Sequence, residues 1–234
     1  MKNKLLYFLI PFLTGFNGFL HAQNPYLGVK AGFNLSTMTW TDDTGDQLEG
    51  LNLSPGFNFG GTMDYRLMPE LTLNASLVLT TKGYRKRYSE EFQGVTVDSR
   101  ERLTLYYIEL PVYAVYEFEV FGLDLIAGLG PFVSYGYWGK YSWKREGGGE
   151  EESEKGDVYW GTNPDTDDLV HIDYGAGIKV GGKYENFVLD LSYQYSIPNI
   201  AADTQNGKVI RNSVFSVSLS YFFSMFYPYN EANY

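Results

Sequence analysis

The acidic residues of segment 139–169 are the first candidates for chemistry in this chain. Asp165, Asp167 and Asp168 lie within four positions of one another and offer carboxylate oxygens, the ligands that divalent cations such as Ca²⁺ prefer. Their spacing does not follow the calcium-binding loop pattern. Residues 146–168 hold nine acidic residues and one lysine, so the segment could instead be a solvated loop or bind a basic partner. We keep the three aspartates as candidate metal ligands.

Residue types that serve nucleophilic or metal-dependent catalysis are scarce. The chain has no cysteine and two histidines, and only His171 lies outside the first 22 residues. A lone histidine beside Asp173 on one strand face is more often a hydrogen-bonded interior residue than a base, and no serine is placed to complete a triad. We find no glycine-rich phosphate loop and no metal-ligand spacing. The sequence therefore predicts no enzyme activity and no cofactor.

Ten further charged residues stand at alternate positions of segments whose other positions are apolar. A period of two predicts β-strands, and eight such segments follow one another: 27–36, 52–66, 71–82, 106–118, 123–136, 170–180, 187–196 and 215–223. Arg or Lys on a lipid-facing strand position costs roughly 2–4 kcal/mol at the bilayer midplane, so apolar rows that face lipid explain why every charge lies on the polar rows. We expect these charges to fill a barrel lumen as paired groups: Lys30, Asp64, Arg66, Lys82, Glu109, Glu117, Asp124, Asp173, Lys179 and Asp190.

The connections between these segments alternate between long and short. Segments 41–50, 83–102, 139–169 and 198–211 are long, and segments 67–70, 119–122 and 181–186 are short. Short periplasmic turns and long external loops are typical of outer-membrane barrels. The sequence therefore predicts an all-β fold, an eight-stranded antiparallel up-and-down transmembrane β-barrel. Pro55, Pro111 and Pro131 fall inside predicted strands, where we expect bulges or bends.

Composition agrees with a membrane barrel. Aromatic residues make up 18% of the chain, and they gather near both ends of the predicted strands, as interfacial girdles do. The net charge of −10 argues against nucleic acid as a partner, because phosphate binding needs a basic surface. Six basic residues in and beside segment 83–102 could contact lipopolysaccharide phosphates or pair with the acidic segment: Lys82, Arg85, Lys86, Arg87, Arg100 and Arg102.

The first residues read as a targeting segment. Lys2 and Lys4 precede an apolar run that ends near Ala22, the order found in secretory signal peptides. We expect residues 1–22 to be a cleaved signal peptide, residues 23–223 the outer-membrane barrel, and residues 224–234 a periplasmic tail. The alternative for the first segment is a membrane anchor helix, for which the apolar run is short.

Several stretches of the barrel region, in this order, resemble the PorT-like outer-membrane β-barrel proteins of Gram-negative bacteria. The matching stretches are 28–36, 107–112, 127–131, 173–177, 189–193 and 212–219. The resemblance covers essentially all of the mature chain and implies an eight-stranded barrel, mostly without an assigned activity. PorT itself belongs to a protein-secretion apparatus, a role that we do not transfer. The resemblance also implies a terminal aromatic residue that the barrel-assembly machinery reads, for which Tyr221, Phe223 and Tyr234 are candidates.

The sequence leaves three functional classes open. The leading hypothesis is a non-enzymatic protein of the bacterial outer membrane with a structural or surface-interaction role through its external loops. Its partners would be outer-membrane lipid, the barrel-assembly machinery and an extracellular or secretion-system protein. A narrow channel for ions or small solutes is the second hypothesis. The third is a soluble lipocalin-like ligand carrier, in which the apolar rows would face inward.

Overall fold

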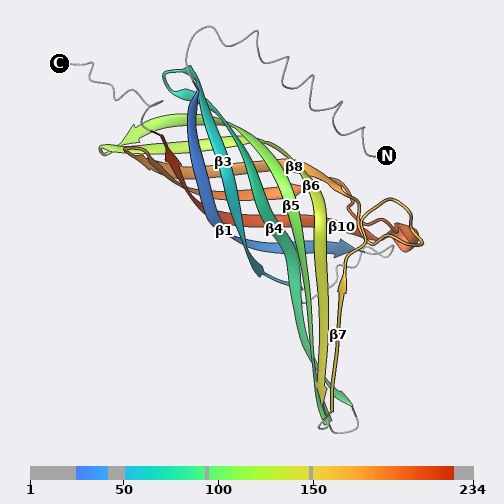
Figure 1. Ribbon diagram of the computed structural model, residues 1–234. Helices are drawn as coiled ribbons and strands as arrows, with labels where there is room; N and C mark the ends of the chain where they lie inside the picture. Colours follow the sequence, from blue (N-terminus) through green and yellow to red (C-terminus); the bar gives the residue numbers. More distant parts are fainter. Residues whose placement is uncertain (1–24, 42–50, 93–94, 148–149, 224–234) are drawn as a thin grey trace, which may run out of the picture.

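The strands of this protein form one antiparallel sheet that closes on itself (Figure 1). The computed structural model describes residues 25–41, 51–92, 95–147 and 150–223. No helix among these residues is long and apolar enough to cross a membrane. The ten strands of the described residues are β1 (Tyr26–Thr41), β2 (Leu51–Asn52), β3 (Ser54–Met68), β4 (Leu71–Phe92), β5 (Val95–Val120), β6 (Leu123–Gly147), β7 (Glu150–Asp157), β8 (Ile172–Tyr184), β9 (Phe187–Ser196) and β10 (Val209–Phe222).

Eight of these strands make the barrel wall. They follow the chain as β1, β3, β4, β5, β6, β8, β9 and β10, and each pairs antiparallel with the next. The ring closes where β10 pairs with β1, from Gly28 opposite Phe222 to Thr41 opposite Val209. The predicted eight-stranded up-and-down barrel is therefore confirmed, and β2 and β7 lie outside the ring.

The two rows of each strand face opposite environments. Outward-pointing apolar side chains are exposed, such as Phe33 at 80% and Leu129 at 68%, whereas inward-pointing Asp173 and Asp190 are exposed by 0% and 1%. A water-soluble barrel would bury the apolar row, because that burial drives its folding. The observed faces suit a lipid environment and contradict the soluble, lipocalin-like alternative.

The two ends of the barrel differ in their connections. Tight turns join β3 to β4, β5 to β6 and β8 to β9 at one end, where Tyr26 and Phe222 also lie. The β5–β6 turn places Phe121 at φ 53° and Gly122 at φ 75°, in the left-handed region that glycine adopts without strain. The long connections all lie at the opposite end, as the sequence predicted.

Two of the predicted long loops are largely strand instead. β4 and β5 pair without interruption from Gly83 opposite Thr104 to Phe92 opposite Val95, so segment 83–102 is a long hairpin. β6 continues to Gly147 and pairs with β7, which occupies part of segment 139–169. Both rows of these extensions carry charged residues, so the apolar alternation that identified the other strands is missing there. Two further connections are shorter than predicted. β8 runs to Tyr184, inside segment 181–186, and β10 begins at Val209, inside segment 198–211.

At Pro55, Pro111 and Pro131, where we expected bulges or bends, the strand register does not shift. Pro55 pairs with Leu35 in regular register. The β4–β5 pairing is interrupted between Ala75 opposite Val112 and Val78 opposite Glu109, and it resumes in the same register. Proline lacks the amide hydrogen, so Pro111 removes a ladder donor without inserting a residue. Register shifts occur elsewhere, between Arg66 and Met68 in β3 and between Tyr106 and Tyr107 where β5 faces β6.

Apolar residues inside the barrel gather at its two ends. At the short-turn end, Tyr113, Val115, Ile126, Val188 and Phe222 pack together. At the other end, a second cluster joins strand residues to two connections, 158–170 and 197–208, which we call the loop cap. A backbone hydrogen bond from Val170 N to Ile200 O, 2.9 Å long, joins the two connections. The members of this cluster are Met38, Leu105, Tyr107, Val158, Leu169, Ile200, Ala201 and Ile210. Between the clusters most buried side chains of the lumen are polar, and Val78, Phe132 and Val214 are buried apolar residues outside both clusters.

Candidate functional site

The part of the polar lumen next to the loop cap is centred on Lys82. Its ammonium group lies 2.9 Å from Glu109 Oε2 and 3.0 Å from Asp173 Oδ2. Ser134 donates to Glu109 Oε2 at 2.9 Å, and Asn212 donates to Asp173 Oδ2 at 2.9 Å. All five side chains are buried, so one cation holds two carboxylates in a site that bulk solvent does not reach.

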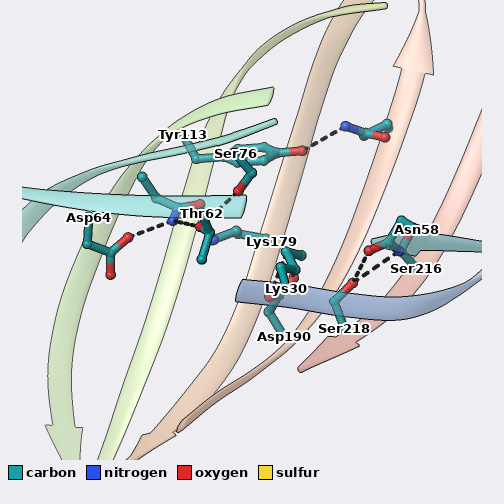
Figure 2. A network of polar contacts seen from close by, with 12 residues as sticks. Lys30, Asn58, Thr62, Asp64, Ser76, Tyr113, Lys179, Asp190, Ser216 and Ser218 are labelled. Carbon is teal, nitrogen blue, oxygen red and sulfur yellow. Dashed lines mark hydrogen bonds and ion pairs between the residues drawn. The ribbon is translucent and has the colours of Figure 1, made fainter. Parts of the chain in front are cut away.

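A second network fills the middle of the lumen (Figure 2). Lys30 Nζ lies 2.8 Å from Asp190 Oδ2. Lys179 donates to Asn74 Oδ1 at 2.8 Å, and Asn74 Nδ2 in turn donates to Asp64 Oδ1 at 2.6 Å. Thr62 and Ser76 extend this chain with hydroxyl contacts. The groups come from strands far apart in sequence, and their hydrogen bonds satisfy buried charges that would otherwise be costly.

A third group lies at the short-turn end and is partly open. Glu117 contacts Lys183 Nζ at 2.5 Å and Arg66 at 3.7 Å, and Thr72 donates to it at 2.7 Å. Lys183 was missed by sequence reasoning, because residues 181–186 were assigned to a turn. Asp124 was predicted to be a lumen charge, and the structure places it elsewhere. It is exposed at the start of β6, where the strand is leaving the barrel, rather than buried in the lumen.

Neutral polar residues were placed on the inward rows by the sequence but were not singled out as members of a lumen network. Asn34 donates to Thr80 at 2.7 Å and accepts from Asn58 at 2.7 Å and from Ser216 at 2.9 Å. These side chains are buried and belong to the same inward rows as the charges. Their signal was available in the sequence, since a buried row of period two includes amides and hydroxyls as well as charges.

The lumen has little free space. The cavity between Lys30, Glu109, Tyr113, Gln194 and Ser218 measures ≈30 Å³. A cavity of this size holds about one or two water molecules. With an apolar cluster at either end, the described residues leave the barrel filled, and its buried charges form ion pairs or hydrogen bonds. The chemistry that this arrangement supports is structural.

Two of the three candidate metal ligands use their carboxylates in hydrogen bonds of the loop. Asp167 accepts the Asn163 amide at 2.9 Å, and Asp168 accepts the Tyr159 amide at 2.9 Å. Asp165 lies in the same turn of the loop cap, and its amide donates to Asn163 Oδ1. Within the described ranges, no group of three His, Asp or Glu residues is placed to hold a metal ion. The carboxylates of Asp167 and Asp168 shape the loop.

His171 has a packing role in the structure. Its ring stacks on Tyr135 with centroids 4.7 Å apart and on Trp160 at 5.8 Å. Its Nδ1 lies 2.7 Å from the Gly136 carbonyl oxygen. This places the histidine between the barrel rim and the loop cap.

The most prominent surface is a sheet that extends beyond the barrel (Figure 1). It consists of the ends of β4, β5 and β6 together with β7, and we call it the protruding sheet (residues 84–92, 95–103, 140–147 and 150–157). Among the described strands, β7 pairs only with β6, so its second edge is free. Exposed acidic residues follow this edge: Glu151, Glu152, Glu154 and Asp157.

Ionisable groups of the protruding sheet interact with one another. Tyr141 donates to Glu154 Oε1 at 3.0 Å, and this hydrogen bond raises the pKa of Tyr141. Lys144 forms ion pairs with Glu146 and Glu151. The hydrogen bond with Lys144 lowers the pKa of Glu146, and the same bond raises the pKa of Lys144. Of the six basic residues predicted to pair with the acidic segment, Arg100 is the one that does so among the described residues, with its guanidinium group 4.0 Å from Glu146 Oε2.

Comparison with known proteins gives a family and a fold. Residues 21–202 match the family described as the outer membrane protein beta-barrel domain. No curated protein matches the sequence. Among solved structures, Ail of Yersinia pestis is 15% identical with a TM-score of 0.38, covering 86% of this chain and 100% of its own. Neisserial surface protein A is 15% identical with a TM-score of 0.42 and the same coverages. The outer-membrane protease OmpT of Escherichia coli is 12% identical with a TM-score of 0.31, covering 86% of this chain and 97% of its own.

Proposed function

Because the chain belongs to the outer membrane protein beta-barrel domain family, we propose that it is a surface-interaction protein whose filled barrel anchors the protruding sheet. The protein lies in the bacterial outer membrane, and its apolar outer rows contact outer-membrane lipid. The long-connection end is then the external end, since short turns face the periplasm. The protruding sheet accordingly reaches into the space outside the cell.

The free edge of β7 carries this proposal. A strand that pairs on one side only presents unpaired amide and carbonyl groups, to which an extended peptide can add as a further strand. The acidic side chains Glu152 and Glu154 along that edge disfavour pairing with a second acidic copy and favour a basic partner. We infer a partner with an extended segment rich in Lys or Arg, carried by an extracellular or secretion-system protein.

The alternatives have less support. A channel needs a continuous path through the lumen. The lumen cavity of ≈30 Å³ lies between two apolar clusters, so it supports an anchoring role instead. An enzyme needs reactive groups poised toward a substrate, whereas the described lumen charges near Lys82 and Lys30 are paired with each other. A non-enzymatic role remains our proposal on these grounds.

Finer assignments also remain proposals. Membership of the PorT-like group is one such proposal, and a secretion-system protein as the partner is another. The signal peptide at residues 1–22 and the tail at residues 224–234 lie outside the described residues, and the barrel at 23–223 lies mostly within them. Recognition by the barrel-assembly machinery rests on the aromatic residues near the end of β10.

The test uses a synthetic peptide of alternating Lys and Val, fluorescently labelled, with the protein displayed on intact cells. We expect saturable binding that the Glu152→Lys/Glu154→Lys variant loses. Asp165→Lys is the matched control, because Asp165 is an exposed acid of the loop cap away from β7. A peptide of equal charge with proline in place of valine cannot add a strand and should not bind. Equal binding of both peptides, or none by the first, would refute the strand-addition proposal.

A further inference from the structure

One face of the protruding sheet continues the lipid-facing row of the barrel. Along β5, Ile108 is exposed on the barrel wall, and Tyr106, Thr104, Arg102 and Arg100 follow at alternate positions. Side chains of a strand alternate between faces, so these residues share the outer face. On the other face, Leu103 and Tyr84 pack against the apolar cluster under the loop cap.

The outer face carries cations on every strand of the sheet. Cross-strand pairing places Arg85 opposite Arg102, Arg102 opposite Ser142 and Ser142 opposite Lys155. Directly opposite residues lie on the same face. The next row toward the tip places Arg87 opposite Arg100 and Arg100 opposite Lys144 in the same way. We define the basic face as Arg85, Arg87, Arg100, Arg102, Lys140, Lys144 and Lys155.

The basic face begins where the lipid-facing surface ends. Tyr106 and Trp138 stack with centroids 4.7 Å apart on the outer surface of the barrel, and Lys140 Nζ lies 4.7 Å from the Trp138 ring centroid. Aromatic residues of this kind mark the membrane interface. Each step of two residues along a strand advances about 7 Å. The cations within two such steps of the aromatic pair therefore stand at the depth of the polar groups of the outer leaflet: Lys140, Arg102, Arg85 and Lys155.

The part of the basic face nearest the barrel contains a hollow. A cavity of ≈490 Å³ is lined by Arg102, Thr104, Tyr106, Lys140, Ser142 and Lys155, among other residues. Guanidinium, ammonium and hydroxyl groups together are donors that suit phosphate oxygens. Asp157 is the one acidic residue in the lining. The cavity thus combines three cations with one carboxylate.

The cations nearest the membrane form no ion pair among the described residues, although Asp157 lies directly opposite Lys140. Like charges directly opposite each other destabilise a strand pair, yet Arg85 faces Arg102. Arg85 Nε is buried without a hydrogen-bond partner, and burial together with repulsion from Arg102 and Arg87 lowers the pKa of Arg85. The ion pairs of the described residues on this face lie at the tip, at Arg100 and Lys144. Five cations of the face form none among the described residues: Arg85, Arg87, Arg102, Lys140 and Lys155.

We propose that the basic face binds the phosphate groups of lipopolysaccharide in the surrounding outer leaflet. The lipid supplies the anions that the paired arginines lack. The attraction fixes the protruding sheet against the headgroup layer on one side and leaves the β7 edge and the opposite face free. This binding does not depend on the strand-addition partner, so the two proposals fail separately.

The experiment titrates detergent-solubilised protein with bis-phosphorylated lipid A and with the same lipid after removal of its phosphates, and measures the bound fraction by native mass spectrometry. We expect binding of the phosphorylated lipid alone. Arg102→Gln/Lys140→Gln should weaken it about tenfold or more, since two charge-assisted hydrogen bonds are lost. Lys86→Gln/Arg145→Gln, on the opposite face of the same sheet, is the matched control and should leave it unchanged.

Each other outcome overturns the proposal. Equal binding of the two lipids means that the phosphates are not recognised. Equal weakening by both double variants means attraction by overall charge. Full competition by millimolar inorganic phosphate means a simple anion site without lipid selectivity. Heat-modified gel mobility checks that each variant is folded, and Lys155→Gln on the exposed strand β7 provides a variant that leaves the barrel wall untouched.

Discussion

Lys30 and Asp190 join two strands of the barrel wall that are not neighbours. Lys30 Nζ lies 2.8 Å from Asp190 Oδ2, although β10 lies between β1 and β9. The contact therefore bridges the seam at which the first and last strands close the ring. Asp190 is exposed by 1%, so its charge depends on this partner.

Replacing one member of this pair should destabilise the barrel. Asp190→Ala leaves the Lys30 ammonium partly buried without a counter-charge, which costs about 3–5 kcal/mol when a buried pair is broken. We expect unfolding in urea at a lower midpoint, measured in lipid vesicles by the loss of heat-modified mobility. The control is Lys30→Met/Asp190→Leu, which removes both charges and should recover most of the loss. An unchanged midpoint for Asp190→Ala would show that the pair contributes little to closure.

Replacement of Lys82 should destabilise the barrel more than replacement of Asp190. The loss of Lys82 leaves Glu109 and Asp173 without a counter-charge in a fully buried site. Lys82→Met should therefore lower the unfolding midpoint further than Asp190→Ala does, or prevent folding into vesicles altogether. Lys82→Met/Glu109→Gln/Asp173→Asn, which makes the site neutral, should fold again. If the triple variant folds no better than Lys82→Met, the defect comes from lost packing and not from charge.

The sequence could predict the barrel because lipid and lumen impose opposite requirements on alternate residues. Lys30 and Asp173 were assigned to the lumen from that period alone, and both point inward. Asp124 departs because it stands at a strand end, where the distinction between lumen and solvent disappears. The pairing of Lys30 with Asp190 could not be predicted, because it depends on the stagger of the closed ring and not on neighbouring strands.

The protruding sheet escaped prediction for a related reason. Outside the membrane neither face of a strand must be apolar, so Arg85 and Arg102 stand where lipid-facing strands carry Leu or Phe. Their positions read as loop because the period of two disappears when both rows are polar. The strands continue there through backbone pairing that begins in the barrel wall.

The filled lumen predicts a lack of steady conductance. With a cavity of ≈30 Å³ between two apolar clusters, the wild-type protein in planar bilayers should give no open-channel steps at moderate voltage. Trp160→Ala/Ile200→Ala removes side chains from the loop-cap cluster while leaving the charges around Lys82 in place. We expect this variant to be silent as well, since the polar network still fills the lumen. Regular steps from the wild type would revive the channel alternative.

The ion pair between Lys144 and Glu146 predicts how the protruding sheet responds to pH. The lowered pKa of Glu146 means that its contribution is complete above the ordinary value of 4.5 and is lost as pH falls through the lower folded pKa. The raised pKa of Lys144 means that its contribution is complete below 10.5 and is lost as pH rises through the higher folded pKa. The pairing should therefore persist across the range between these two ordinary values. An NMR titration of the Glu146 carboxyl carbon should give a midpoint below 4.5, and Lys144→Gln should move it upward. A midpoint that Lys144→Gln leaves unchanged would mean that the two side chains do not pair in solution.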